Sequence, residues 1–291
     1  MRIDCLSLLL ALWILAGCGP SGEPVLPAAP IEHVAVRMAE GYRHHRLLPP
    51  LPDTLSIDGA RALRAAFVAR LRSDLGPPVG YKAALTSAES RARFGAKEPL
   101  WGVLLRDMLR PSGDTVATLF GARPVFEGDL IVRVADEAIN TAATDEALLA
   151  GLDAVIPFLE LPDLLFDPVV PLDARALTAV NAGARLGLLG EPVPLAGPAD
   201  ARARLGAVRV ILKVGDGTIL AEGGTHRLDD AVGALRWLRD ALRQDGITLH
   251  TGDLLSLGSL TPLVPVLPRA TVTAQYEGLA DEPVDVTVTF E

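Results

Sequence analysis

The chain has 291 residues, a formal net charge of −9 at pH 7 and two cysteines. This acidic balance argues against a nucleic-acid partner and against adhesion to anionic lipid, because both depend on clustered positive charge. Beyond its first thirty residues or so, the chain is long enough to bury a sizeable core as one large domain.

The N-terminus is typical of a targeting segment. Arg2 precedes an apolar run from Leu6 to Ala16, which has the length of a signal-peptide core and is too short to span a membrane. The run leads into Leu-Ala-Gly-Cys, which resembles a bacterial lipobox whose cysteine, here Cys18, becomes the diacylated first residue. The alternatives are an ordinary secretory signal cleaved nearby and a start codon assigned too early.

We therefore predict a signal peptide over residues 1–17 and a Pro- and Gly-rich tether over residues 18–30. Lipid on Cys18 would anchor the protein to the bacterial cell envelope, facing the periplasm, and Gly19 after it favours the outer membrane. Both cysteines, Cys5 and Cys18, lie in this segment, so the single domain expected over residues 31–291 has no thiol for catalysis, metal binding or a disulfide.

The first part of the domain is predicted to begin with two helices, at residues 31–42 and 57–72. In the second helix, apolar residues recur at helical spacing, and Gly76-Pro77-Pro78 ends it. Shorter elements are expected next: a strand at residues 79–87, a helix at 88–94, and strands at 101–105 and 116–119.

The middle of the chain is predicted to hold two apolar strands joined through a helix. The first strand covers residues 124–132 and the second ends at Glu160 after the apolar run 155–159. Between them, a Thr/Asp cap opens a helix expected over residues 144–154.

The C-terminal third is predicted to be mostly sheet. Gly215-Asp216-Gly217 joins two strands in a hairpin, and one clear helix follows at residues 229–244. The expected strands are 208–214, 218–222, 247–250, 254–257, 270–276 and 284–290. Because antiparallel strands outnumber helices here and β-α-β alternation is weak, we predict a mixed, sheet-rich α/β domain.

Three carboxylates stand out in these elements. Glu127 and Asp129 are two residues apart on one strand, so their side chains point to the same face. Together with Glu160 they could converge on one hard divalent cation, which would remove the cost of gathering negative charge in an apolar setting. The alternative, a solvated strand face, is the commoner fate of such a spacing.

Four motifs resemble the 2-keto-4-pentenoate hydratase branch of the fumarylacetoacetate hydrolase superfamily. They are Gly-Tyr-Lys-Ala-Ala-Leu-Thr-Ser at residues 80–87, Phe94-Gly95 through Leu105, Glu127-Gly128-Asp129 with the later Glu160, and the stretch from Ala231 to Thr261. Their order and spacing are kept from about residue 34 to the C-terminus. The resemblance implies the curled β-sheet core with flanking helices of the fumarylacetoacetase C-terminal-like fold.

The resemblance also implies an activity: metal-dependent hydration of a short 2-hydroxydienoic acid such as 2-hydroxypenta-2,4-dienoate. Mg²⁺ or Mn²⁺ would be held by Glu127, Asp129 and Glu160 and would chelate the 2-oxo acid, stabilising its enolate. Lys82 would be the catalytic residue that gives the dienolate a proton or a fixed positive charge, with a pKa lowered by partial burial beside a cation. A surface lysine is the alternative.

Other features implied by the resemblance are more open. Gly258 and Ser259 would line the substrate pocket, although a strand-end turn explains them equally well. A decarboxylase acting on a 2-oxo-3-enedioate of the 4-oxalocrotonate type is the second candidate, because the two activities share the metal site and the lysine. Relatives commonly assemble, so a homo-oligomer is compatible with the resemblance.

Several residues depart from the family pattern. Asp129 replaces a glutamate, Val180 and Gly183 replace an acid and a serine, and Leu100 stands where many members are polar or acidic. These changes predict a more apolar pocket and affect the hydration step more than metal binding. They also leave open a non-catalytic envelope lipoprotein that binds a small carboxylate or a metal.

Overall fold

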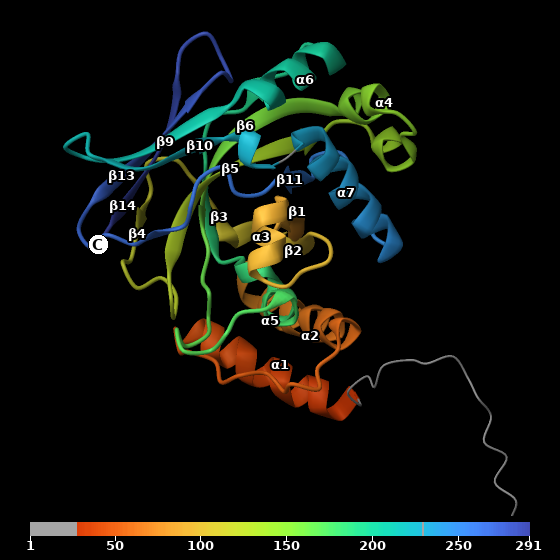
Figure 1. Ribbon diagram of the computed structural model, residues 1–291, viewed down its shortest axis with the longest axis vertical. Coiled ribbons are helices and arrows are strands. Elements are labelled where there is room, and N and C mark those ends of the chain that lie inside the picture. Colours follow the sequence, from red (N-terminus) through yellow and green to blue (C-terminus); the bar gives the residue numbers. More distant parts are fainter. Residues whose placement is uncertain (1–27, 229) are drawn as a thin grey trace, which may run out of the picture.

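The computed structural model describes residues 28–228 and 230–291 (Figure 1). The predicted signal peptide and Cys18 lie outside these residues. Helix α1 (Ala28–Arg43) begins three residues before its predicted start at residue 31, so it includes the last three residues of the predicted tether. None of the helices in the described parts of the chain has the length and apolar character needed to cross a membrane.

A large sheet of nine strands forms the centre of the fold, with the order β2-β1-β11-β5-β6-β7-β3. Two short strands are attached to it, β12 on β5 and β8 on β6. The strands are β1 (Pro78–Ala84), β2 (Leu100–Leu105), β3 (Leu109–Pro111), β5 (Val125–Val134), β6 (Leu152–Leu161), β7 (Leu186–Leu189), β8 (Val193–Pro194), β11 (Leu254–Ser256) and β12 (Val264–Pro265). Strands β5 and β6 pair antiparallel along nearly their whole length, and most of their residues are buried.

A second sheet of five strands has the order β10-β9-β13-β14-β4 and packs beside the first (Figure 1). Its strands are β4 (Thr115–Val116), β9 (Arg209–Val214), β10 (Ile219–Gly224), β13 (Thr271–Glu277) and β14 (Val284–Phe290). Inward and outward residues alternate on β13, and Tyr276 is fully buried. Its hydroxyl donates to the carbonyl of Phe158 on β6 at 2.5 Å, which joins the two sheets.

Helices cover the large sheet in two groups (Figure 1). The first group is α1, α2 (Ile57–Leu75) and α5 (Ala174–Ala179), and the second is α4 (Asp145–Ala150), α6 (Pro198–Ala207) and α7 (Ala231–Gln244); the short α3 (Ala88–Arg93) lies between β1 and β2 in the sequence. Helix α2 begins where the Ser56 side chain accepts the N–H of Gly59 at 3.1 Å. It ends at Gly76, whose φ of 77° is open to glycine at little cost.

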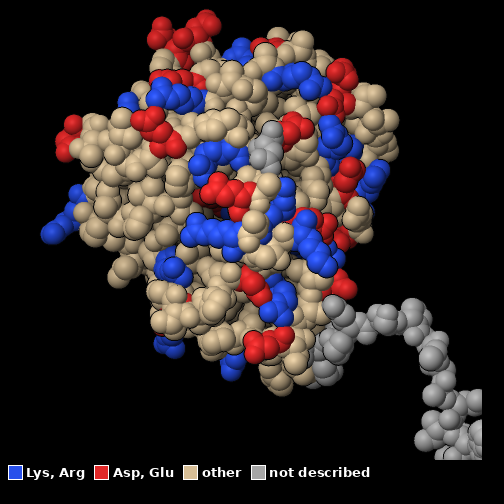
Figure 2. Space-filling view, viewed as in Figure 1, with Lys and Arg blue, Asp and Glu red and all other residues tan. Residues whose placement is uncertain are grey.

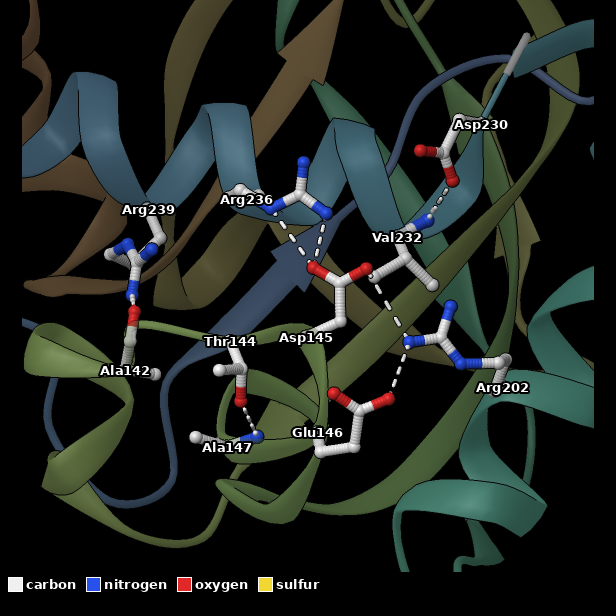
Figure 3. Close-up of polar contacts among 10 residues, drawn as sticks. All are labelled: Ala142, Thr144, Asp145, Glu146, Ala147, Arg202, Asp230, Val232, Arg236 and Arg239. Carbon is white, nitrogen blue, oxygen red and sulfur yellow. Dashed lines mark hydrogen bonds and ion pairs between the residues drawn. The ribbon is translucent and has the colours of Figure 1, made fainter.

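One acidic residue ties the second group together (Figure 3). Asp145, at the start of α4, accepts hydrogen bonds from Arg202 of α6 at 3.4 Å and from Arg236 of α7. The side chain of Thr144 caps the same helix by accepting the N–H of Ala147 at 3.2 Å. These pairs are partly exposed, so each contributes little alone, and their value lies in linking three helices.

Basic and acidic side chains are interspersed on the face of the molecule shown in Figure 2. In the described parts of the chain, many basic and acidic side chains form ion pairs, such as Arg209 with Glu222 at 2.7 Å and Arg133 with Asp153 at 2.8 Å. Opposite charges on this face therefore largely balance one another over short distances.

The predicted fold class, a mixed and sheet-rich α/β domain, is confirmed, and local boundaries differ where tertiary contacts decide them. The strand expected to reach residue 87 stops at Ala84, because Leu85 has a positive φ of 56° that breaks the extended backbone. The helix expected to reach residue 154 ends at Ala150, because β6 begins two residues later. The strand predicted at residues 116–119 is only two residues long, and residues 247–250 form no strand.

Asp163 organises the loops next to the end of β6. Its side chain is fully buried and accepts backbone N–H groups from Ala122, Arg123 and Leu165 at 2.9, 2.8 and 3.1 Å. Its own N–H donates to the carbonyl of Gly183 at 2.9 Å. One carboxylate therefore satisfies three backbone donors from two chain segments.

We predict that Asp163→Ala lowers the free energy of unfolding by about 3 kcal/mol, because three backbone N–H groups lose their acceptor. Asp167→Ala is the matched control, since the side chain of the half-buried Asp167 accepts one backbone N–H, that of Val169. Urea unfolding of both variants measures the difference. Equal stability of the two variants would contradict this role of Asp163.

Candidate active site

Strands β5 and β6 place the three predicted carboxylates on one face of the large sheet. Glu127 and Glu160 are direct cross-strand partners, and Asp129 lies two residues further along β5 on the same side. Their exposed fractions are 5%, 2% and 0%, so the cluster is buried. A solvated strand face is therefore wrong for these residues.

Lys82 lies in the same cluster, on strand β1. Strand β11 separates β1 from β5, with Lys82 opposite Ser256 and Ser256 opposite Ile131. Lys82 is 3% exposed; its Nζ atom donates to Glu160 Oε1 and, at 3.2 Å, to the carbonyl of Ala182. The surface-lysine alternative is therefore wrong. The chain has three lysines among its 291 residues, and Lys82 is the one of the three that is buried.

Asp129 is held by strand β11 and the loop that follows it. Its Oδ2 accepts the hydroxyl of Ser256 at 2.6 Å, and its Oδ1 accepts the N–H groups of Gly258 at 3.1 Å and Leu130 at 2.5 Å. Aspartate has one methylene fewer than glutamate, and the structure keeps its carboxylate close to β11. Gly258, with a φ of 104°, thus contacts Asp129 directly, and the half-buried Ser259 lies against Glu127.

Burial shifts the protonation of this cluster strongly. Desolvation, helped by the nearby charge of Glu160, raises the pKa of Glu127 to about 8 and that of Asp129 to about 7. For Lys82, desolvation favours the neutral form, but the carboxylates of Glu160, Glu127 and Asp129 more than offset it. The pKa of Lys82 is therefore raised, and the predicted lowering is wrong for this arrangement of charges.

The chemistry of these donors fits a hard divalent cation. Three carboxylates face one lysine, and Glu160 Oε2 is buried without a hydrogen-bond partner. Across residues 28–228 and 230–291, however, no three acidic, histidine or cysteine side chains are arranged as a ready metal site. The reason is visible in the contacts, because Lys82 engages Glu160 while Ser256 and Gly258 engage Asp129.

Two of the residues that depart from the pattern of the resembling family, Val180 and Leu100, are buried apolar side chains. Val180 is fully buried and Leu100 is 8% exposed. Leu100 pairs with Ala84, two residues from Lys82, and so belongs to the same face of the sheet as Lys82. Gly183 has no side chain, so none of these three positions offers a polar side chain to hold a water molecule.

A cavity of about 990 Å³ lies beside the site, between α2, α5, α7 and the loop that leads into β2. Aromatic and charged side chains line it, among them Phe94, Trp237 and Arg175. None of the four cluster residues lines it, whereas Leu100 does. The buried charges, rather than the volume of this cavity, therefore define the candidate active site.

Sequence reasoning missed three residues of the site: Ser256, Asn181 and Ala182. Ser256 stands in the stretch from Ala231 to Thr261 that carries the family resemblance, which was the available sequence signal, while its place on β11 opposite Lys82 is seen only in the structure. The role of Ala182 lies in its carbonyl group, which no sequence pattern reveals.

Known proteins resemble this chain over most of its length, although no family model matches it. The 2-keto-4-pentenoate hydratase of Burkholderia vietnamiensis is 26% identical over 257 residues, which cover 86% of this chain and 94% of that protein. The solved 4-oxalocrotonate decarboxylase of Pseudomonas putida G7, complexed with magnesium and adipate, has a TM-score of 0.79 at 20% identity and covers 92% of this chain and 99% of its own.

A third similar structure is a putative fumarylacetoacetate hydrolase family protein of Yersinia pestis, with a TM-score of 0.50 and 14% identity. It covers 74% of this chain and 93% of its own. The predicted fumarylacetoacetase-like fold is therefore confirmed.

We predict that Lys82→Met lowers the free energy of unfolding by about 3–5 kcal/mol, because the substitution leaves Glu160 buried without its counter-charge. Urea unfolding in the presence of EDTA measures this difference. The double variant Lys82→Met/Glu160→Gln should recover part of this loss, since the uncompensated charge is gone. Lys213→Met is the control; Lys213 makes one bond, to Gln275, at a half-buried position. If Lys82→Met costs no more than Lys213→Met, the buried pair is not as described.

Proposed function

We propose that this protein is a divalent-metal-dependent hydro-lyase acting on a short 2-oxo or 2-hydroxydienoic acid of the 2-hydroxypenta-2,4-dienoate type. The observation that carries the proposal is the buried cluster of Glu127, Asp129, Glu160 and Lys82 on one sheet face. Similarity to a curated 2-keto-4-pentenoate hydratase over 94% of that protein's length supports the reaction class.

The cation, Mg²⁺ or Mn²⁺, would be held by Glu127, Asp129 and Glu160. A bound cation would supply a chelating partner for the 2-oxo acid and positive charge for the enolate. Magnesium in the similar decarboxylase structure supports the choice of a hard divalent ion. The ammonium group of Lys82, fixed between Glu160 and the Ala182 carbonyl, can give its proton to the substrate carbon chain. Ser259, which lies against Glu127, would contact the substrate carboxylate.

A decarboxylase is the second candidate, and the apolar site favours it. Hydration needs a water molecule held for addition to the double bond, whereas Val180, Gly183 and Leu100 offer no polar side chain for this purpose. In decarboxylation of a 2-oxo-3-enedioate, the bond to the terminal carboxyl group breaks, CO₂ leaves, and the resulting dienolate takes one proton. The fold similarity to 4-oxalocrotonate decarboxylase supports the same reading.

We predict metal-dependent loss of ultraviolet absorbance when the purified protein meets freshly generated 2-hydroxypenta-2,4-dienoate or 4-oxalocrotonate. Glu127→Gln should lower kcat/KM at least about 100-fold, because it removes a charged ligand. Glu222→Gln is the control, since Glu222 is exposed on β10 and pairs with Arg209. The preferred acid separates hydratase from decarboxylase. No turnover of either acid by folded protein in Mg²⁺ or Mn²⁺ would contradict both enzymes and favour a binding protein.

We also propose that the mature protein is anchored to the cell envelope through lipid on Cys18, facing the periplasm and favouring the outer membrane. The support is the Leu-Ala-Gly-Cys ending of the N-terminal apolar run and Gly19 after it.

We predict that a radiolabelled fatty acid labels the wild type and not Cys18→Ala in a bacterial host, with Cys5→Ala as the control. Equal labelling of Cys18→Ala and wild type would contradict the anchor.

A further inference from the structure

The turn from Asn181 to Gly183 has an unusual backbone. Its three residues have φ values of 58°, 52° and 71°, all in the left-handed region. Glycine adopts this region readily and asparagine more readily than most other residues, whereas Ala182 pays a steric cost there. Something outside the turn must therefore hold it in this form, and the turn lies at the cluster that contains Lys82.

Asn181 provides that hold by docking on the open edge of strand β2. Its Oδ1 accepts the N–H of Val103 at 2.7 Å, and its Nδ2 donates to the carbonyl of Val103 at 2.9 Å. The side-chain amide thus replaces a neighbouring strand for this residue of β2, and it is fully buried. Gly102 allows the close approach, because a Cβ atom there would lie 2.5 Å from the carbonyl oxygen of Asn181.

The docked turn presents a carbonyl group to the catalytic lysine. Gly102 is the cross-strand partner of Lys82, so the turn sits directly next to this lysine. The carbonyl of Ala182, one residue after Asn181, accepts from Lys82 Nζ at 3.2 Å. Lys82 Nζ is therefore fixed from two sides, by Ala182 and by Glu160.

We propose that Asn181 is a positioning residue for Lys82: its grip on Val103 holds the Ala182 carbonyl in place and thereby fixes the direction in which the ammonium group points. The effect of this direction on turnover rests on the proposed function. The claim that Asn181 holds Lys82 in place is independent of the proposed function, because it concerns only how tightly the lysine is held.

The chain offers a closely matched control. It has two asparagines, and the second, Asn140, makes the same pair of bonds, accepting the N–H of Leu249 at 2.9 Å and donating to its carbonyl at 2.8 Å. Neither Asn140 nor Leu249 contacts the carboxylate cluster through a hydrogen bond. The other two lysines, the exposed Lys97 and the half-buried Lys213, serve as internal references for Lys82.

The experiment compares Asn181→Ala with Asn140→Ala in the full chain under metal-free conditions. Acetic anhydride labels the lysines, and mass spectrometry reports the rate at Lys82 relative to Lys97 and Lys213. We expect both variants to lower the melting temperature, since Asn181→Ala loses two side-chain hydrogen bonds and Asn140→Ala loses three, the third to the carbonyl of Glu137. Only Asn181→Ala should speed labelling of Lys82, by about 10-fold or more, because local opening of the turn frees the amine.

Turnover provides a second readout. Asn181→Ala should lower kcat about 10-fold or more with KM little changed, since a misdirected proton donor affects the reacting state rather than binding; Asn140→Ala should leave both near wild type. Equal Lys82 labelling in the two variants would overturn the proposal, even for a protein with no activity toward either acid. If Asn181→Ala fails to fold, Asn181→Asp against Asn140→Asp repeats the comparison while keeping the acceptor for the backbone N–H.

Discussion

The buried pairing of Lys82 with Glu160 is the interaction on which the rest of the site depends. Three carboxylates lie within one sheet face, and one lysine supplies the positive charge that they share. Burying such charges is costly unless they are paired and hydrogen-bonded. The sheet, the loops and the turns around the cluster supply the pairing and the hydrogen bonds that stabilise these buried charges.

Two parts of the structure stabilise the buried charges: the strand register and the turn next to Lys82. The antiparallel register of β5 and β6 brings Glu127 and Glu160 face to face, and β11 inserts Ser256 and Gly258 where Asp129 needs donors. Around this core, the strained turn at Asn181 closes the cluster at Lys82. The resulting site is rich in charge at its centre and apolar at its margin, an environment suited to enolate chemistry in which access of water is limited.

Sequence periodicity was sufficient to place Glu127 and Asp129 on one side of a strand, because two-residue spacing determines which side chains share a side, whereas the family resemblance was needed to group them with Glu160. It was also sufficient for the sheet-rich class and the β9–β10 hairpin. The contacts of Asp129 with Ser256 and Gly258 join residues 127 and 129 positions apart, so only the folded register reveals them. The raised pKa of Lys82 escaped prediction for a related reason, because its sign depends on the sum of all the charges brought together by folding.

The central claim is that Glu127, Asp129 and Glu160 bind one divalent cation. Crystals grown with Mn²⁺, with diffraction data collected on both sides of the manganese absorption edge, test it most directly. The account predicts an anomalous peak bounded by these three carboxylates, and no such peak in crystals of Glu127→Gln. Well-diffracting wild-type crystals at saturating Mn²⁺ with no peak at this cluster would contradict it.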